Sequence, residues 1–204
     1  MKYLSIALLW AGYCALHSYL ISIGFTNLLN RLLKKYYAFY RLFYVLISLF
    51  LLIPLINYTA QLDNEVIIIY GASLDIVRNI LIYSSLLMFF WAFFVDYDSL
   101  SFFGVRQILN FGRAKKTDPS GEIKRSGLLG IIRHPMYFAL IIYIWCQTLR
   151  ISDIVVNTVL TVYIIIGTRL EEKKLILEFG ERYIKYKKEV PMLIPFTKGS
   201  KKQY

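Results

Sequence analysis

The stretch that decides the fold is Tyr3–Asn30, YLSIALLWAGYCALHSYLISIGFTNLLN, which contains no Lys, Arg, Asp or Glu. Two further stretches, Leu42–Leu62 and Asn79–Val95, are also free of charged residues. A membrane-spanning helix needs roughly 17–25 mostly apolar residues, and these three stretches satisfy that length. Two shorter apolar stretches, Pro135–Leu149 and Ile154–Thr168, satisfy it when their flanking residues are included.

The composition agrees with this membrane assignment. Hydrophobic residues make up 57% of the 204 residues and charged residues only 18%, whereas about a quarter of a soluble domain is charged. We therefore expect an all-α, polytopic integral membrane protein with about five transmembrane helices. Tyr3–Phe25 is preceded by a single basic residue, Lys2, and lacks a small-residue cleavage site, so we expect it to be a retained span and not a cleaved signal peptide. The expected spans are about 3–23, 37–60, 76–96, 127–149 and 151–168.

The charged residues between the spans predict the orientation. The 24–36 connection is basic, the 61–75 connection is acidic, and the 97–126 loop carries six Lys or Arg. The segment from Arg169 onward carries ten. Because cytoplasmic connections are enriched in Lys and Arg, we expect the N-terminus outside and the C-terminus in the cytoplasm. The net charge of +11 then indicates contact with membrane lipids.

One membrane domain is expected, in two parts. Residues 1–126 supply the N-terminal spans and the long loop, in which 117–121 (TDPSG) is a turn signal. Residues 127–204 supply a helical hairpin and a cytosolic C-terminal segment. In that segment Leu175, Phe179, Tyr183 and Tyr186 recur at helical spacing. We expect an amphipathic helix there, or two short ones separated at Gly180, which end before Pro191.

Several polar residues within or beside the spans have structural interpretations. We expect His17 to be a hydrogen-bonded core histidine and Arg41 to be an anchor at the membrane boundary. Asp96 and Asp98 are candidates to cap a helix or to bind a cation. The two cysteines are isolated and predict neither a disulfide nor a metal site. The basic residues flank spans, so we do not expect nucleic-acid binding.

Two clusters have the residue types that chemistry needs. Arg133-His134-Pro135-Met136-Tyr137 opens an apolar span, and the proline favours a helix start while biasing His134 away from helical dihedrals. Arg169-Leu170-Glu171-Glu172 follows the last span. If the last two spans form a tight hairpin, both clusters lie on the cytosolic side and meet there.

A longer pattern contains both clusters. Arg133-His134-Pro135-x-Tyr137 is followed by Glu171-Glu172, by FGxxYxxY from Phe179 to Tyr186, and by VPxxIP from Val190 to Pro195. Over about 70 residues this resembles the isoprenylcysteine carboxyl methyltransferase superfamily. Within it, Tyr163–Gly167 and Val190–Pro195 look most like the methanethiol S-methyltransferase branch, whereas the basic tail after Phe196 looks more like the isoprenylcysteine branch. Isoprenylcysteine enzymes have an Asn-Pro pair where this chain has Asp153-Ile154, which argues against a prenylated-protein substrate.

The resemblance implies an S-adenosylmethionine-dependent methyltransferase with a cofactor site at the cytosolic boundary. It implies cofactor contacts from the following residues: Arg133, His134, Pro135, Tyr137, Arg169, Glu171, Glu172 and Tyr183. His134 and Glu172 are the candidates for catalytic acid–base work. Carboxylates suit the ribose diol and amino group of the cofactor, an Arg fork suits its carboxylate, and an aromatic face suits its sulfonium. No metal is expected.

The identity of the methyl acceptor stays open at this point. A small thiol, a membrane-borne lipid and an isoprenylcysteine-type group are all compatible with a pocket at the membrane boundary. The main alternative is a non-enzymatic membrane assembly factor or a small transporter that retains the fold. Deeply placed charge pairs would favour that alternative, and His17 is the only titratable residue near a span centre. The sequence predicts no oligomeric state.

Overall fold

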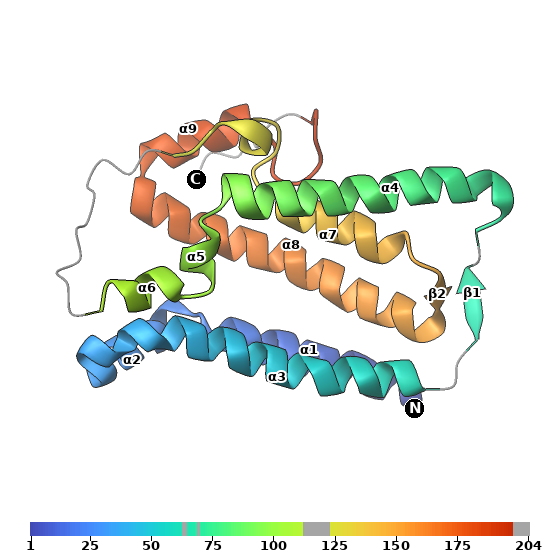
Figure 1. Ribbon diagram of the computed structural model, residues 1–204, viewed down its shortest axis with the longest axis horizontal. Coiled ribbons are helices and arrows are strands. Elements are labelled where there is room, and N and C mark those ends of the chain that lie inside the picture. The colour runs from blue at the N-terminus through green and yellow to red at the C-terminus, as the bar shows by residue number, and fades with distance from the viewer. Residues whose placement is uncertain (63–64, 69, 112–122, 198–204) are drawn as a thin grey trace. The chain divides into compact units, whose positions relative to one another are not determined.

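The computed structural model describes residues 1–62, 65–68, 70–111 and 123–197 (Figure 1). The turn predicted at 117–121 lies outside the described residues. The described part is almost entirely helical, as the sequence predicts. Its α-helices are α1 (Lys2–Leu20), α2 (Ile23–Leu33), α3 (Tyr40–Gln61), α4 (Ala72–Trp91), α5 (Ser99–Phe102), α6 (Val105–Leu109), α7 (Pro135–Trp145), α8 (Ile151–Phe179) and α9 (Glu181–Glu189).

Shorter elements link these helices. Two are 3-10 helices, η1 (Lys34–Phe39) and η3 (Gly127–Gly130), and one is a π-helical turn, η2 (Ala92–Asp96). Two short strands, β1 (Val66–Ile68) and β2 (Leu149–Arg150), pair antiparallel. The chain forms two compact units, and α8 begins in the first and continues in the second. The first unit is Met1–Ile68, Asp98–Thr117 and Leu149–Leu160; the second is Ile69–Tyr97, Asp118–Thr148 and Thr161–Tyr204.

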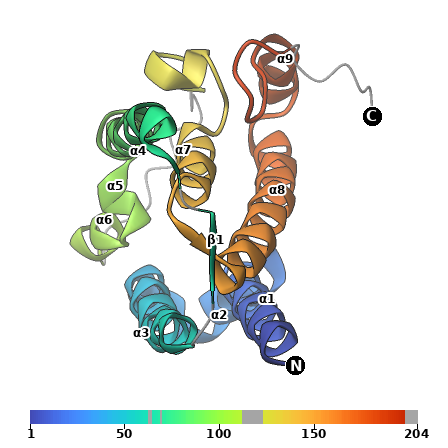
Figure 2. The same ribbon diagram turned by 90° about the vertical axis from the view of Figure 1, so that its right-hand side faces the viewer.

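The first unit is built around an antiparallel pair of helices, α1 and α3, which lie side by side in both ribbon views (Figures 1 and 2). Trp10 Nε1 donates to Thr59 Oγ1 at 3.0 Å. Further along, His17 Nε2 lies 2.5 Å from the Tyr44 hydroxyl, so the predicted hydrogen bond of His17 is confirmed, whereas its side chain is half-buried and not in the core. Asp98 caps α5 by accepting from the Ser101 N–H at 3.2 Å, and the Arg41 guanidinium lies 5.6 Å from the Phe102 ring centroid.

In the second unit α4 packs antiparallel to α7, and α7 packs antiparallel to the second half of α8. The Tyr70 hydroxyl donates to the Trp145 carbonyl at 3.1 Å, and Trp145 Nε1 donates to Thr161 Oγ1 at 3.0 Å. The predicted hairpin of the last two apolar stretches is therefore present. It places the first residues of α7 beside the part of α8 that follows Thr168.

Three helical stretches are long and apolar enough to cross a bilayer: Ile23–Gln61, Leu74–Asp96 and Ile151–Phe179. The chain is therefore an integral membrane protein. α7 is apolar but has only 11 residues, because the predicted span 127–149 begins with the η3 turn and with non-helical residues before Pro135. The count of five spans and the orientation of the termini stay predictions.

The boundary between membrane and tail also differs from the expectation. The predicted span 151–168 continues without a break to Phe179, so the acidic pair Glu171-Glu172 lies on the same helix as the apolar stretch. The break occurs at Gly180, where φ is +59°, a backbone conformation that favours glycine. α9 follows at once and ends at Glu189, before Pro191.

Candidate functional site

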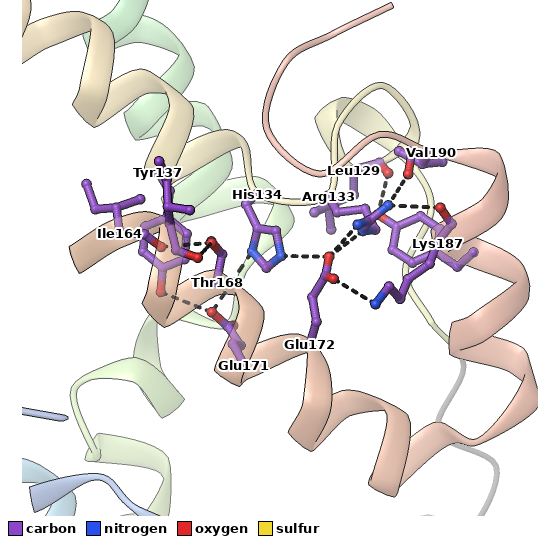
Figure 3. Close-up of polar contacts among 12 residues, drawn as sticks. Leu129, Arg133, His134, Tyr137, Ile164, Thr168, Glu171, Glu172, Lys187 and Val190 are labelled. Atoms are coloured by element: carbon purple, nitrogen blue, oxygen red, sulfur yellow. Dashed lines mark hydrogen bonds and ion pairs between the residues drawn. The ribbon is translucent and has the colours of Figure 1, made fainter. Parts of the chain in front are cut away.

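The site begins in the non-helical residues that precede α7. Pro135 occupies the first turn of α7, and His134 has φ −128° and ψ 65°, which lies outside the helical region that a following proline disfavours. The N–H groups of Arg133 and His134 donate to the carbonyls of Pro191 (2.9 Å) and Met192 (3.1 Å). The segment after α9 therefore fixes the residues that open α7, and their side chains extend toward α8 (Figure 3).

A buried ion-pair cluster joins the segment before α7 to α8 and α9. Arg133 Nε and Nη2 both lie 2.6 Å from Glu172 Oε1, and Lys187 Nζ lies 3.0 Å from Glu172 Oε2. The side chains of Arg133 and Glu172 are only 2% and 5% exposed. Arg133 Nη1 also donates to the carbonyls of Lys187 and Val190. Both carboxylate oxygens of Glu172 are therefore engaged by cations, as burial of a charge requires.

His134 lies between two carboxylates. Its Nε2 is 3.4 Å from Glu172 Oε1 and its Nδ1 is 4.0 Å from Glu171 Oε2 (Figure 3). The imidazole is 2% exposed and stacks on the Tyr137 ring with centroids 5.7 Å apart and planes at 22°. The Tyr137 hydroxyl donates to Glu171 Oε2 at 3.1 Å. Glu171 is 39% exposed, so its carboxylate is the accessible edge of the cluster.

Two tyrosines of α9 form the wall behind this cluster. Tyr183 and Tyr186 meet edge to face at 5.7 Å and pack with Val190 in an apolar core. The Tyr186 hydroxyl donates to the Leu129 carbonyl at 2.6 Å. Burial raises the pKa of Tyr186 to about 12 and raises the pKa of Tyr183 as well. Both phenols therefore keep their protons at neutral pH, and Tyr186 acts as a hydrogen-bond donor.

Most of the predicted site residues come together and one does not. Arg133, His134, Tyr137, Glu171 and Glu172 contact one another through the bonds described above. Pro135 is fully buried at the start of α7 and Tyr183 lies in the adjacent apolar core. Arg169 is exposed on α8, and no hydrogen bond or ion pair joins it to the cluster within the described ranges. The cofactor contacts predicted for all eight residues stay predictions.

Sequence reasoning missed Lys187, which supplies the second cation on Glu172. Lys187 is one of several basic residues in a highly charged segment, and its charge alone does not distinguish it. Its position depends on the bend at Gly180, which turns α9 back toward α8. The spacing of Tyr183 and Tyr186, buried on one side of α9, was the available signal, because Lys187 directly follows the second of them.

Asp96 is a further buried polar residue of the second unit. It ends η2, is 6% exposed, and lies beside the Leu128 backbone and Lys124. A Cβ on Gly127, whose φ is +64°, would lie 2.6 Å from Asp96 Oδ1, so only glycine fits there. Among the described residues, no group of three or more His, Cys, Asp or Glu could hold a metal ion.

Comparison with known proteins gives consistent names. The chain is 42% identical over 95 residues to a methanethiol S-methyltransferase of Pseudomonas deceptionensis, a match covering 46% of this chain and 36% of the relative. It is 35% identical over 95 residues to one of Crocosphaera subtropica, covering 46% and 37%. It is 33% identical over 114 residues to methanethiol S-methyltransferase 1 of Bradyrhizobium diazoefficiens, covering 55% and 39%.

These matches have limited extent. The chain spans less than two fifths of the length of these three relatives. No family model matches the chain, and no solved structure matches it. Within that extent, the resemblance inferred from the RHPxY and acidic motifs is confirmed, and the chain is similar to bacterial methanethiol S-methyltransferases.

Proposed function

We propose that this chain is an integral-membrane, S-adenosylmethionine-dependent methyltransferase that acts on a small thiol. The observation that carries the proposal is the His134 imidazole held between Glu171 and Glu172 beside Tyr137. A buried histidine flanked by two carboxylates, one of them accessible, provides a place where a proton can be held or moved. The names of the similar proteins support methyl transfer as the reaction.

The donor set fits S-adenosylmethionine. Glu171 is an accessible acceptor for hydroxyl or amino groups, and the stacked rings of His134 and Tyr137 offer an aromatic surface that suits a sulfonium cation. When bound, the cofactor supplies an electrophilic methyl group, which an aligned sulfur can accept by in-line displacement. Arg169 is exposed on α8, the helix that carries Glu171, and remains our proposed partner for the cofactor carboxylate.

The chain's own residues would divide the work as follows. Glu172 is paired with two cations, so its charge is neutralised locally and it orients His134 and Arg133. His134 is the proposed base that accepts the proton of a thiol acceptor, because a neutral thiol is a weak nucleophile. Glu171 lies on the other side of the imidazole, where it stabilises the protonated ring. The predicted direct catalytic role of Glu172 stays a prediction.

A small thiol is the acceptor that we favour, since the similar proteins are named for methanethiol. A lipid-borne or isoprenylcysteine-type acceptor is the second candidate, because the site adjoins apolar helices. A non-enzymatic assembly factor or transporter is the remaining alternative. It requires no cofactor binding, so a binding measurement separates it from both enzyme proposals.

The first test is calorimetric titration of S-adenosylmethionine into the detergent-purified full chain. We expect saturable binding that Glu171→Gln and His134→Ala weaken. Glu178→Gln is the matched control for Glu171→Gln, because Glu178 is an exposed acid further along α8. Absence of binding in folded protein would remove the methyltransferase proposal.

The second test is turnover. Methanethiol, a prenylcysteine and a phospholipid amine are supplied separately with S-adenosylmethionine, and the methylated products are quantified by mass spectrometry. We expect the methylated thiol to form and His134→Ala to abolish it. Methylation of the prenylcysteine or the lipid alone would retain the enzyme assignment and replace the proposed acceptor.

A further inference from the structure

An apolar pocket lies in the first unit, where α1, α2, η1 and α3 meet. Its volume is about 290 Å³, near the lower end of the roughly 300–1,000 Å³ that small-molecule sites occupy. Phe25, Leu29 and Leu33 recur every four residues along α2 and supply one wall. Leu20 and Tyr40 close the pocket toward α1 and α3. The lining is almost wholly apolar, so the pocket suits a hydrocarbon chain.

The pocket walls are fixed by specific contacts. The Tyr40 hydroxyl donates to the Leu20 carbonyl at 2.7 Å, which ties the start of α3 to the end of α1. The Tyr40 ring stacks on Tyr37 at 5.6 Å and meets Phe25 edge to face at 6.3 Å. Ser22 caps the start of α2 by accepting from the Phe25 N–H at 3.4 Å. The pocket is therefore a preformed feature of the unit.

The rim of the pocket is basic. Lys34 and Lys35 are exposed and lie between the pocket-lining residues Leu33 and Tyr36. Lys34 has φ +49° and ψ −119°, a conformation that costs energy for a non-glycine residue and is found disproportionately at binding sites. This conformation forms the corner between α2 and η1. The Lys35 ammonium lies 5.2 Å from the ring centroid of Tyr36, which lines the pocket, and Lys34 is its neighbour in the chain.

The charge of the whole segment has a single sign. Residues 1–62 contain five Lys or Arg and no Asp or Glu, so no acidic side chain of this segment neutralises Lys34 and Lys35. Arg31 adds a third exposed cation one turn earlier on α2. Leu28 and Leu32 on α2 are 52% and 67% exposed, as expected for a helix that contacts lipid. These features suit a ligand that combines an apolar chain with a negative charge.

We propose that this pocket binds one anionic phospholipid, with an acyl chain inside the apolar lining and its phosphate on Lys34 and Lys35. Positive charge beside an apolar surface attracts anionic lipids over zwitterionic ones. The lipid pocket lies within the first unit, and all eight residues predicted to contact the cofactor lie in the second. A negative result for lipid binding would therefore leave the proposed methyltransferase activity untouched, and the reverse also holds.

The test is competitive lipid binding to the full chain in an uncharged detergent, read by native mass spectrometry. Dioleoylphosphatidylglycerol and dioleoylphosphatidylcholine are supplied in equal amounts, so that only the headgroup differs. We expect retention of the anionic lipid to exceed that of the other about tenfold, and Lys34→Gln with Lys35→Gln to abolish the preference. The control is Lys173→Gln with Lys185→Gln, which removes two exposed cations of the second unit and should preserve it.

The acyl chain is tested separately. Leu29→Trp fills the pocket and should reduce retention of both lipids. Folding is judged by circular dichroism, and Leu29→Phe replaces Leu29→Trp if the larger side chain prevents folding. Glycerophosphoglycerol, which has no acyl chain, should not displace the bound lipid. Equal retention of the two lipids by the wild type, loss of preference in the control variant, or displacement by glycerophosphoglycerol would each overturn the proposal.

Discussion

The Arg133 guanidinium places two nitrogens, Nε and Nη2, at the same 2.6 Å distance from Glu172 Oε1, and both side chains are almost fully buried. This pair joins the residue before α7 to the middle of α8. Lys187 approaches the other carboxylate oxygen from α9 at 3.0 Å. One acidic side chain therefore holds three separate chain segments together, and its charge should matter more for folding than that of an exposed acid.

Glu172→Gln should destabilise the protein by about 3 kcal/mol, because Arg133 and Lys187 lose their buried counter-charge. Adding Arg133→Gln should recover part of that loss, since one unpaired cation is removed. Both variants are compared by thermal and denaturant unfolding in detergent. Equal stability of Glu172→Gln and wild type would show that the cluster is solvated in solution.

Tyr137→Phe should weaken S-adenosylmethionine binding about fivefold to tenfold. The substitution removes the hydroxyl that donates to Glu171 at 3.1 Å, and such a bond contributes about 1 kcal/mol. Calorimetry gives the dissociation constant, and Tyr143→Phe is the control, because Tyr143 lies on the same helix and is 36% exposed. An unchanged dissociation constant in Tyr137→Phe would show that the bond from Tyr137 to Glu171 does not affect cofactor affinity.

Gly127→Ala should lower stability by about 1–3 kcal/mol, since φ is +64° and the new Cβ would lie 2.6 Å from Asp96 Oδ1. Gly12→Ala is the contrasting change. Gly12 lies inside α1, and a Cβ added there would meet nothing within 4 Å, so alanine should stabilise the helix by about 0.5–1 kcal/mol. The melting temperatures of the two variants should therefore shift in opposite directions.

Stability should fall at alkaline pH partly through Tyr186. Burial raises the pKa of Tyr186 to about 12 in the folded protein, against about 10 in an unfolded chain. Folding therefore favours the protonated phenol. The resulting contribution to the free energy of unfolding is complete below pH ~10 and is lost as the pH rises toward ~12. At neutral pH, Tyr186→Phe should lower the free energy of unfolding by about 1 kcal/mol, because the bond to the Leu129 carbonyl is lost. As the pH is raised, the variant should lose less stability than the wild type. Melting temperature against pH measures both effects.

The sequence predicted the meeting of the two clusters because the apolar stretches indicated an antiparallel hairpin. It could not predict which acid pairs with which residue. Adjacent residues Glu171 and Glu172 point about 100° apart on a helix, and the register of α7 against α8 decides that Tyr137 contacts the first and Arg133 the second. That register depends on packing along the whole hairpin, including Trp145 with Thr161.

Other differences also have local causes. Residues 127–134 are apolar enough to count toward a span, but positive φ at Gly127 and the bonds of Arg133 and His134 to Pro191 and Met192 keep them out of the α7 helix. The apolar composition of residues 127–134 does not predict hydrogen bonds to a segment nearly 60 residues further along the chain. The position of Lys187 likewise follows from the bend at Gly180 and not from its own neighbours.

Because α8 is uninterrupted, it should not tolerate insertions or deletions of single residues. Between Thr161, which accepts the Trp145 bond, and Glu171, which accepts the Tyr137 bond, the chain is continuous helix. Inserting or deleting a single codon there would rotate Glu171 and Glu172 about 100° around the axis relative to α7. Substitutions on the outer side of this segment are expected to be tolerated, whereas single-residue length changes would separate both acids from their partners at once.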